Sequence, residues 1–549
     1  MMSATRQKWG WRWGTGVSEF CFDLAREAWL PVRFDDGTAG ELGLVEVLQR
    51  AHEVVGLDLD YPTQEPALLR LLLACCHRLM SGPVDEASWK RLWADGHLPA
   101  AAVESYFSQW SDRFDLFSGE RPFFQVPGLE SVGKDGVKTV NALVAFAPSG
   151  NNVPVFTPLT NDSGLELSPA DAARWLVERH AWGTASDKTG AKGNTQVKAG
   201  KYTPRIGHLA WIGFVAPIGE TLFETLLLNL IPWDRSGLAG ADDLPAWERE
   251  PLGPVPRTRP AGGVCDLFTW QGRRVRLFPE LRGDQTVVTR VLICAGDEVA
   301  RDAVRSVDPH TGWRRKKEKD GSFTYSPIRA RPGQQVWRGL ASLLASGENE
   351  ERARVLSWLA RLESIGVDRV SLLVTSAEFG QMSTTVTDLV SDRLDAPVVV
   401  LRREDLEAAT VAEQAVALVD AAGRALWRIA EAPYLAYDAE KDSHLVPEGR
   451  SDQARAARAA LAEELFGALD AAFRRFLLDL ATYDDVQSIR GVWAEKVAGV
   501  AWTLASGRLA QLSAAQAYSG AVAESRFRYV FAKARAEFTG GDESERGAA

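Results

Sequence analysis

The chain has 549 residues, 46% of them hydrophobic, and a formal net charge of -10 at pH 7. This length predicts roughly two to four domains with large hydrophobic cores. Affinity for nucleic-acid phosphates comes from lysine and arginine. The net charge therefore excludes wrapping by nucleic acid over the whole surface and confines any such contact to local patches.

Cysteine usage and the absence of long apolar segments indicate the compartment. The chain has five cysteines and no C-x-x-C pair, so neither a disulfide framework nor a zinc ribbon is predicted. It has no apolar run of about 18 residues and no apolar core of a signal peptide after the first basic residues. We expect a cytoplasmic protein with free thiols and no membrane contact.

The first part of the chain mixes short strands and helices. Residues 35–37 read DDG, a turn between a short apolar run and a helical pattern at Leu44, Val47 and Leu48. A second apolar helix opens at Pro66. Short elements rich in tryptophan and phenylalanine follow, and this mixture predicts an α+β fold.

Residues 371–394 read SLLVTSAEFGQMSTTVTDLVSDRL, two β-rich runs that meet at Gly380. This pattern predicts a β-hairpin with Gln381 and Met382 at its tip. From the residues alone, the tip is either a simple connection or a functional projection.

From about residue 400 onwards, alanine, leucine, arginine and glutamate dominate in four segments with helical spacing. Breaks at Pro433, at residues 483–485 and at Ser513 separate the segments. The pattern predicts an antiparallel four-helix bundle. We therefore expect a large mixed domain over residues 1–400 that carries the nucleic-acid-contacting loops, a bundle over 401–540 and a disordered tail over 541–549.

Known catalytic patterns are not found. Gly200-Lys201 is followed by Tyr202, which excludes a Walker loop, and the seven histidines show no paired spacing. We expect no enzyme activity, no metal and no cofactor. One alternative stays open, a carboxylate-dependent metal nuclease, for which the candidate pairs are Asp58/Asp60, Asp242/Asp243 and Asp484/Asp485.

Positive charge gathers in two segments of this acidic chain. Residues 183–205 hold five basic residues against one acidic residue, Asp187. Residues 313–338 hold eight basic residues against Glu318 and Asp320. Such runs are commonly solvated faces, but both segments are also rich in Gly, Ser, Thr and Pro, which allow close backbone approach to a duplex. We therefore predict local nucleic-acid contacts in both segments.

Several stretches in order along the chain resemble one family. They are AWLPV at 28–32, WSDRFDLFSGERPFFQ at 110–125, GETLFETLLLNLIPWD at 219–234, DLPAWER at 243–249, DLFTWQGRRVRL at 266–277 and DPHTGWRRKK at 308–317. The chain resembles the CasA family, the large subunit of the type I-E CRISPR Cascade surveillance complex. The predicted C-terminal bundle also fits this family.

The resemblance implies a non-catalytic subunit. Such a subunit recognises the protospacer-adjacent motif through the DNA minor groove, wedges the duplex open to start R-loop formation and helps to recruit the helicase-nuclease. The implied partners are guide RNA, double-stranded target DNA, the other Cascade subunits and that helicase-nuclease. A further alternative of a different class is a purely structural scaffold subunit.

The resemblance also assigns sites. The motif-reading loop corresponds to Gly183, Thr184, Ala185, Ser186, Asp187, Lys188, Thr189 and Gly190. Small residues suit this role because minor-groove readout is degenerate and depends on close backbone approach. The wedge corresponds to Gly380 and Gln381 at the hairpin tip.

Three further assignments follow from the resemblance. No lysine occupies the region of the family's basic finger, so Arg301, and after it Arg305, takes that place. Phe156 matches an aromatic residue that contacts the 5′ handle of the guide RNA, where a ring can stack on an unpaired base. Contacts to DNA phosphates are assigned to Lys192, Lys198, Lys201, Arg314, Arg315, Lys316, Lys317 and Lys319.

Overall fold

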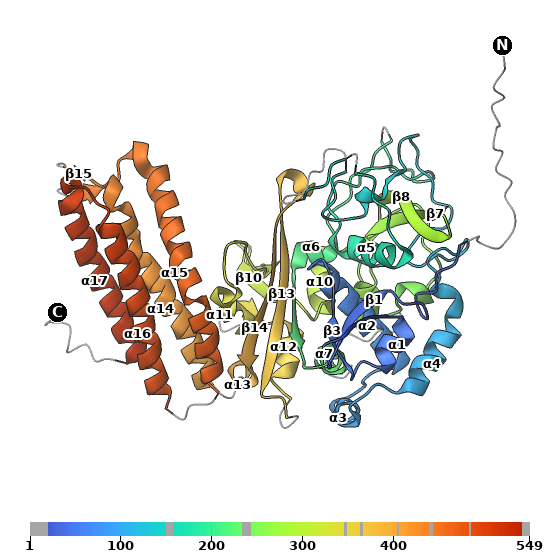
Figure 1. Ribbon diagram of the computed structural model, residues 1–549, viewed down its shortest axis with the longest axis horizontal. Coiled ribbons are helices and arrows are strands. Elements are labelled where there is room, and N and C mark those ends of the chain that lie inside the picture. Colours follow the sequence, from blue (N-terminus) through green and yellow to red (C-terminus); the bar gives the residue numbers. More distant parts are fainter. Residues whose placement is uncertain are drawn as a thin grey trace, which may run out of the picture.

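The fold combines a mixed α and β part with a helical C-terminal part (Figure 1). The computed structural model describes residues 20–149, 157–161, 163–198, 200–232, 243–344, 349–362, 366–402, 406–438, 443–481 and 485–540. No helix among these residues is long and apolar enough to cross a membrane.

The first elements form a small antiparallel sheet covered by helices. Gly37, at φ 82°, makes the turn between the first two strands, as the DDG triplet predicts. The strand order is β2-β1-β3. The elements are β1 (Leu30–Phe34), β2 (Ala39–Leu42), α1 (Leu44–Gln49), β3 (Val54–Leu57), α2 (Gln64–Leu79), α3 (Glu86–Asp95) and α4 (Ala100–Gln109).

The middle segment adds a long twisted hairpin, β7–β8, edged by β4. Its strands are β4 (Lys138–Thr139), β5 (Phe214–Ile218), β6 (Thr258–Arg259), β7 (Arg273–Arg282), β8 (Gln285–Ala295) and β9 (Glu298–Val299). Its helices are α5 (Pro169–Trp182), α6 (His208–Ile212), α7 (Leu222–Asn229), α9 (Val264–Phe268) and α10 (Arg301–Val307). Helix α2, buried along most of its length, packs against α5, α7 and α9 and forms the centre of the core.

Two more sheets follow. The predicted hairpin over residues 371–394 is confirmed, since β13 pairs antiparallel with β14, and β5 completes a sheet in the order β14-β13-β5. A second sheet has the order β11-β10-β12. The elements are β10 (Trp313–Lys317), β11 (Phe323–Pro327), α11 (Leu340–Leu344), β12 (Glu350–Glu351), α12 (Arg354–Leu359), β13 (Arg369–Phe379), β14 (Val386–Pro397) and α13 (Val398–Leu401).

The C-terminal part contains four long helices that lie side by side (Figure 1). Ser513 and Gln516 form a capping box just before the last helix, and Asp485 caps the third, which agrees with the predicted breaks. The elements are α14 (Leu406–Glu431), β15 (Ala436–Asp438), β16 (Ser443–Leu445), α15 (Ser451–Asp479), α16 (Val486–Leu509) and α17 (Ala517–Thr539).

Tryptophan and arginine join the two parts. Trp337 is fully buried, stacks on Phe473 of α15 at 4.3 Å between ring centroids, and donates its indole N–H to Asp470 at 2.8 Å. Arg474 of the same helix pairs with Asp392 of β14 at 2.7 Å. The aromatic stack therefore joins α15 to the segment around Trp337, and the charged contact joins it to β14.

Candidate nucleic-acid interface

The predicted reading loop begins directly at the C-terminal end of α5. Gly183 donates its N–H to the carbonyl of Arg179 at 3.0 Å. A Cβ at this position would lie 2.6 Å from that carbonyl oxygen and 2.9 Å from an Nη atom of Arg273. Only glycine fits at position 183, because the carbonyl belongs to the helix and the guanidinium is held by the loop itself.

Asp187 fixes the loop from within. Its carboxylate lies 2.5 Å from a nitrogen of Arg179 and 2.8 Å from Nε of Arg273. Burial raises the pKa of Asp187, but the two guanidinium groups outweigh this effect and hold the pKa below its ordinary value. Arg273 also donates to the carbonyl of Thr184 at 2.6 Å and to that of Arg205 at 3.0 Å. One buried arginine therefore holds the start of the loop at Thr184 and the returning chain at Arg205.

Beyond Asp187 the chain doubles back on itself. Gly190 donates to the carbonyl of Gly200 at 2.9 Å, and Lys198 and Lys201 exchange backbone hydrogen bonds at 3.0 Å. The side chains of Lys198 and Lys201 are exposed at this turn. Lys192 is also exposed and pairs with Glu130 at 2.7 Å, so part of its charge is already balanced.

The eight assigned loop residues differ in accessibility. Ser186, Lys188 and Thr189 are half-buried. The other five residues are buried and therefore support the loop. They are Gly183, Thr184, Ala185, Asp187 and Gly190.

The tip of the β13–β14 hairpin meets this loop. Ala185 donates its backbone N–H to the carbonyl of Ser383 at 2.8 Å. Gln381 is exposed next to Met382, whose side chain is 74% exposed. Met382 and Ser383 have φ values of 56° and 54°, which is uncommon for residues with a side chain. Two segments far apart in the sequence, both assigned from the resemblance, thus lie in direct contact.

The two basic-finger candidates have different surroundings. Arg305 pairs with Glu351 at 2.7 Å and lies over the ring of Tyr325 at 3.9 Å. Arg301, at the start of α10, lies over the indole of Trp211 at 4.6 Å and is exposed. The positive charge of Arg305 is therefore balanced by a carboxylate, whereas Arg301 lies over an uncharged ring and is exposed.

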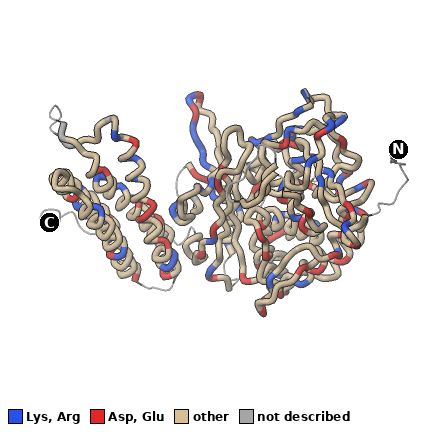
Figure 2. The backbone as a smooth tube through the Cα atoms, turned by 45° about the horizontal axis from the view of Figure 1, so that its top comes forward, with Lys and Arg blue, Asp and Glu red and all other residues tan. Residues whose placement is uncertain are grey.

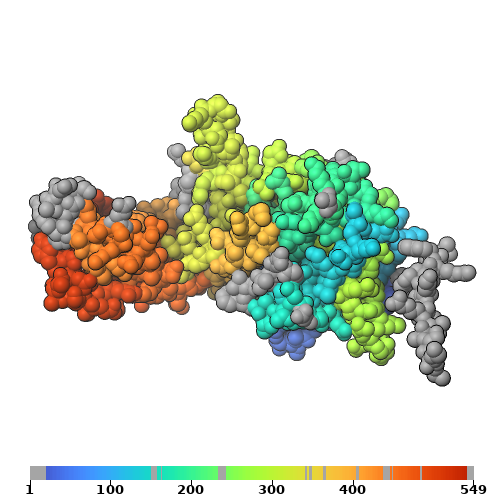
Figure 3. Space-filling view, turned by 90° about the horizontal axis from the view of Figure 1, so that it is seen from above, coloured from blue at the N-terminus to red at the C-terminus, as the bar shows by residue number. Residues whose placement is uncertain are grey.

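The β10–β11 hairpin projects from the body of the molecule (Figures 2 and 3). Lys317 and Lys319 are exposed near its turn, and Lys316 lies 3.6 Å from Glu318. Arg314 pairs with Glu350 at 2.6 Å, and Arg315 lies over the ring of Phe323. Cationic side chains thus lie along a two-stranded projection, a kind of element that the major groove of DNA admits.

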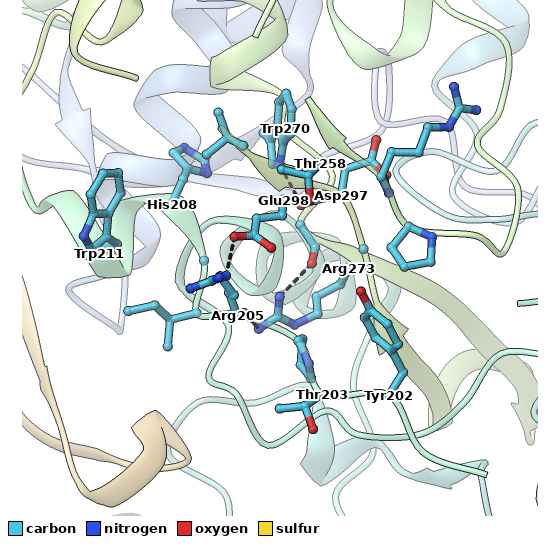
Figure 4. Close-up of a pocket in the computed structure, with 18 of the residues that line it drawn as sticks. Tyr202, Thr203, Arg205, His208, Trp211, Thr258, Trp270, Arg273, Asp297 and Glu298 are labelled. Carbon is cyan, nitrogen blue, oxygen red and sulfur yellow. Dashed lines mark hydrogen bonds and ion pairs between the residues drawn. The ribbon is translucent and has the colours of Figure 1, made fainter. Parts of the chain in front are cut away.

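A cavity of about 410 Å³ lies behind the reading loop (Figure 4). Arg205 and Glu298 form an ion pair across it, and Arg273 is shared between its wall and the loop. Its lining comes from four separate stretches of the chain, residues 202–211, 255–258, 270–273 and 296–301, together with Gln196.

The carboxylate pairs of the nuclease alternative have structural contacts. Asp243 accepts N–H groups from Cys265 and Asp266 at the start of α9, and Asp58 pairs with Arg33. Asp242 and Asp484 lie outside the described residues. Among the residues described, no group of three or more His, Cys, Asp or Glu side chains could hold a metal ion. Nothing in these contacts favours a nuclease.

Phe156, assigned to the guide-RNA handle, lies outside the described residues. Sequence reasoning missed Arg179, Arg273, His208 and Trp211. Only the sequence RRVR at 273–276, three arginines in a short stretch, offers a signal that a buried charge needs a partner there.

Comparison with known proteins gives consistent matches. A family model described as CRISPR-associated protein Cse1 matches residues 23–504. The crystal structure of Cse1 from Acidimicrobium ferrooxidans is 57% identical and superposes with a TM-score of 0.88, covering 95% of this chain and 100% of its own. The CRISPR-associated protein CasA/Cse1 of Thermus thermophilus is 29% identical, covering 87% of this chain and 91% of its own. A chain of a CRISPR RNA-guided surveillance complex is 21% identical and shares the fold, with a TM-score of 0.68 over 94% of this chain and 99% of its own.

Proposed function

Because the chain belongs to the CRISPR-associated Cse1 family, we propose that it is the subunit of an RNA-guided surveillance complex that reads the protospacer-adjacent motif and opens the duplex beside it. In this proposal the subunit recognises DNA and catalyses no reaction. Once the duplex is open, the subunit helps to recruit the helicase-nuclease. The guide RNA and the other Cascade subunits are its partners within the assembled complex.

The hydrogen bond between Ala185 and Ser383 is the observation that carries this proposal. It joins the loop assigned to reading with the tip assigned to wedging. In the proposed complex, Ser186, Lys188 and Thr189 approach the minor groove, since they are the accessible members of the loop. Gln381 then inserts between base pairs next to the motif. The free energy that this unstacking costs is offset when the target strand pairs with the guide RNA.

Charge supports the same arrangement. The exposed side chains of Lys198, Lys201, Lys317 and Lys319 are suited to phosphate contacts, which position a duplex without reading its sequence. Arg301 is the preferred basic finger, because Arg305 is neutralised by Glu351. In this proposal, residues 1–400 form the nucleic-acid-reading domain and the helices of 401–540 form a four-helix bundle.

The test replaces the wedge side chain in the assembled complex. Gln381→Ala should leave guide-RNA binding unchanged and reduce strand separation of target DNA by about tenfold, because unstacking costs a few kcal/mol that the tip no longer supplies. Permanganate reactivity of unpaired thymines measures the opened fraction.

Gln285→Ala is the matched control. Gln285 is an exposed glutamine at the turn of another hairpin, β7–β8, and its replacement should leave opening unchanged. If the Gln381→Ala complex opens DNA as fast as the parent at equal salt, the wedge assignment is wrong.

A further inference from the structure

The cavity behind the reading loop has the size and composition of a ligand site. Its volume of about 410 Å³ lies within the range of roughly 300–1,000 Å³ that small-molecule sites occupy. It combines aromatic, cationic and neutral polar side chains with two acidic ones, Asp297 and Glu298 (Figure 4). Neither the reading loop nor the wedge uses its interior.

A flat cationic platform forms one wall. The guanidinium of Arg301 lies over the indole of Trp211 at 4.6 Å, and Trp211 itself packs edge-on against Trp313. Trp211 is half-buried and Arg301 is exposed, so the stacked pair is supported from below and accessible from above. Arginine planes and indole rings are the surfaces on which unpaired bases stack.

His208 belongs to the same wall but offers no accessible hydrogen-bonding group. Its side chain is 5% exposed, and both ring nitrogens are buried without a hydrogen-bond partner among the described residues. Burial, together with the electrostatic effects of Arg70 and His180, holds the pKa of His208 well below its ordinary value, so the ring is a neutral part of the wall.

Positive charge lies at the rim. Arg257 and Arg301 carry exposed side chains there, while Arg205 is paired with Glu298. A stacking platform and a cationic rim are together the features that bind a base and its phosphate.

We propose that this cavity holds one unpaired nucleotide of the target DNA. Its base stacks on the Arg301–Trp211 pair, and its phosphate lies against Arg257. In this bound state Arg301 serves as the platform and not as the basic finger. The assignment to DNA rests on the proposed function, because Arg273 is shared between this cavity and the reading loop. The nucleotide pocket then captures a base that has left the stack beside the motif.

The test uses the full chain and a free fluorescent probe, 2-aminopurine 2′-deoxyriboside 5′-monophosphate. Stacking on the platform should quench the probe saturably. Arg301→Gln and Trp211→Leu should each weaken binding by about tenfold, as expected for removal of a stacking partner. Circular dichroism checks the fold, and the exposed Arg301→Gln carries the test if Trp211→Leu does not fold.

The helical part offers a matched control. Arg528 lies over the indole of Trp502 at 4.1 Å, the same pairing without this cavity. Trp502→Leu and Arg528→Gln should leave probe binding unchanged. Absence of saturable quenching, or equal weakening in the control variants, would overturn the proposal.

Competition identifies the ligand. Unlabelled deoxynucleotide should displace the probe, and inorganic phosphate at the same concentration should not. Displacement by phosphate alone would reduce the cavity to an anion site. Tighter binding of the ribonucleotide would assign the cavity to guide RNA. Either result would overturn the proposal.

The two proposals fail separately. If the probe does not bind while Gln381→Ala blocks duplex opening in the assembled complex, the nucleotide pocket is wrong and the proposed function stands. If the probe binds with the expected dependence on Arg301 while Gln381→Ala opens DNA normally, the wedge is wrong, and the pocket loses its assignment to the DNA beside the motif.

Discussion

At the scale of single residues, Asp187 is the most consequential side chain of the reading loop. The resemblance assigns it to the DNA-facing loop, and it lies buried between Arg179 and Arg273. A buried carboxylate between two guanidinium groups is costly to break, because removal of its charge leaves both cations uncompensated. Its contribution is to hold the loop in place.

Asp187→Asn should therefore lower the free energy of unfolding by about 3–5 kcal/mol, as breaking a buried ion pair does. Urea-induced unfolding of the full chain measures the change. Asp320→Asn, on the exposed turn of the β10–β11 hairpin, should leave the unfolding midpoint where it is. A midpoint that stays constant in Asp187→Asn would show that the buried pairs do not stabilise the fold.

At the scale of elements, charge reversal on the β10–β11 hairpin distinguishes a DNA-reading subunit from a purely structural scaffold subunit. Lys317→Glu combined with Lys319→Glu should weaken target binding by the assembled complex. The slope of log affinity against log salt should fall by roughly one for each phosphate that the hairpin no longer neutralises. Filter binding over a range of salt concentrations gives this slope.

Lys496→Glu, at an exposed lysine of α16, reverses one charge where the hairpin variant reverses two, and it should leave the slope unchanged. A scaffold would respond differently. If the hairpin variant fails to assemble with the other subunits and retains the salt slope, the hairpin serves protein contacts.

At the scale of the whole molecule, buried histidines set the response to acid. Burial lowers the pKa of His77 to about 4 and that of His180 to about 3, and it places the pKa values of His208 and His310 well below their ordinary values. The unfolded chain binds these protons near pH 6.5, whereas the folded chain does not. Stability should therefore fall as pH decreases from about 7 to about 4.

Glu178 acts in the opposite direction. Burial raises its pKa to about 7, so the folded state holds a proton that the unfolded state releases above about pH 4.5. This contribution is fully present below about pH 4.5 and is lost as pH rises to about 7. Burial likewise raises the pKa values of Asp23, Glu65, Asp243 and Asp420. Arginines hold the pKa values of Glu104 and Asp187 below their ordinary range, and these carboxylates add to the loss of stability in acid. With the four histidines, we expect a net loss of stability in acid.

Unfolding measured between pH 7 and pH 4 tests this balance. His77→Gln should flatten the profile by about 1.4 kcal/mol per pH unit within the window between the two pKa values. The exposed His52, changed to Gln, is the control and should not alter the slope. A parent protein that becomes more stable on acidification would contradict the argument.

Local patterns predicted much of the fold. The stripe of Leu461, Leu465, Leu469 and Phe473 predicts a helix that buries one face, and these residues are buried in α15. The two β-rich runs around Gly380 predict the β13–β14 hairpin for the same reason, since the signal lies within one stretch of chain. The break at Ser513 was also predicted from local sequence, and the structure adds the capping box with Gln516.

The site was less predictable because its contacts are distant in sequence. Asp187 and Arg273 are 86 residues apart, and no local period links them. The cavity draws its lining from four stretches, so Trp211 and His208 carry no signal of their own in the sequence. The loop and the hairpin tip were assigned from the resemblance, while their hydrogen bond became visible only in three dimensions.

The anchoring of the loop by Arg273 has a thermodynamic consequence. A loop that is ordered only on contact with DNA must lose backbone entropy at that moment, at roughly 1–2 kcal/mol per residue. Here the conformation is already set when the polypeptide folds. Calorimetry of motif recognition should therefore reveal a heat-capacity change that reflects only the surfaces brought together, without the added signature of coupled folding.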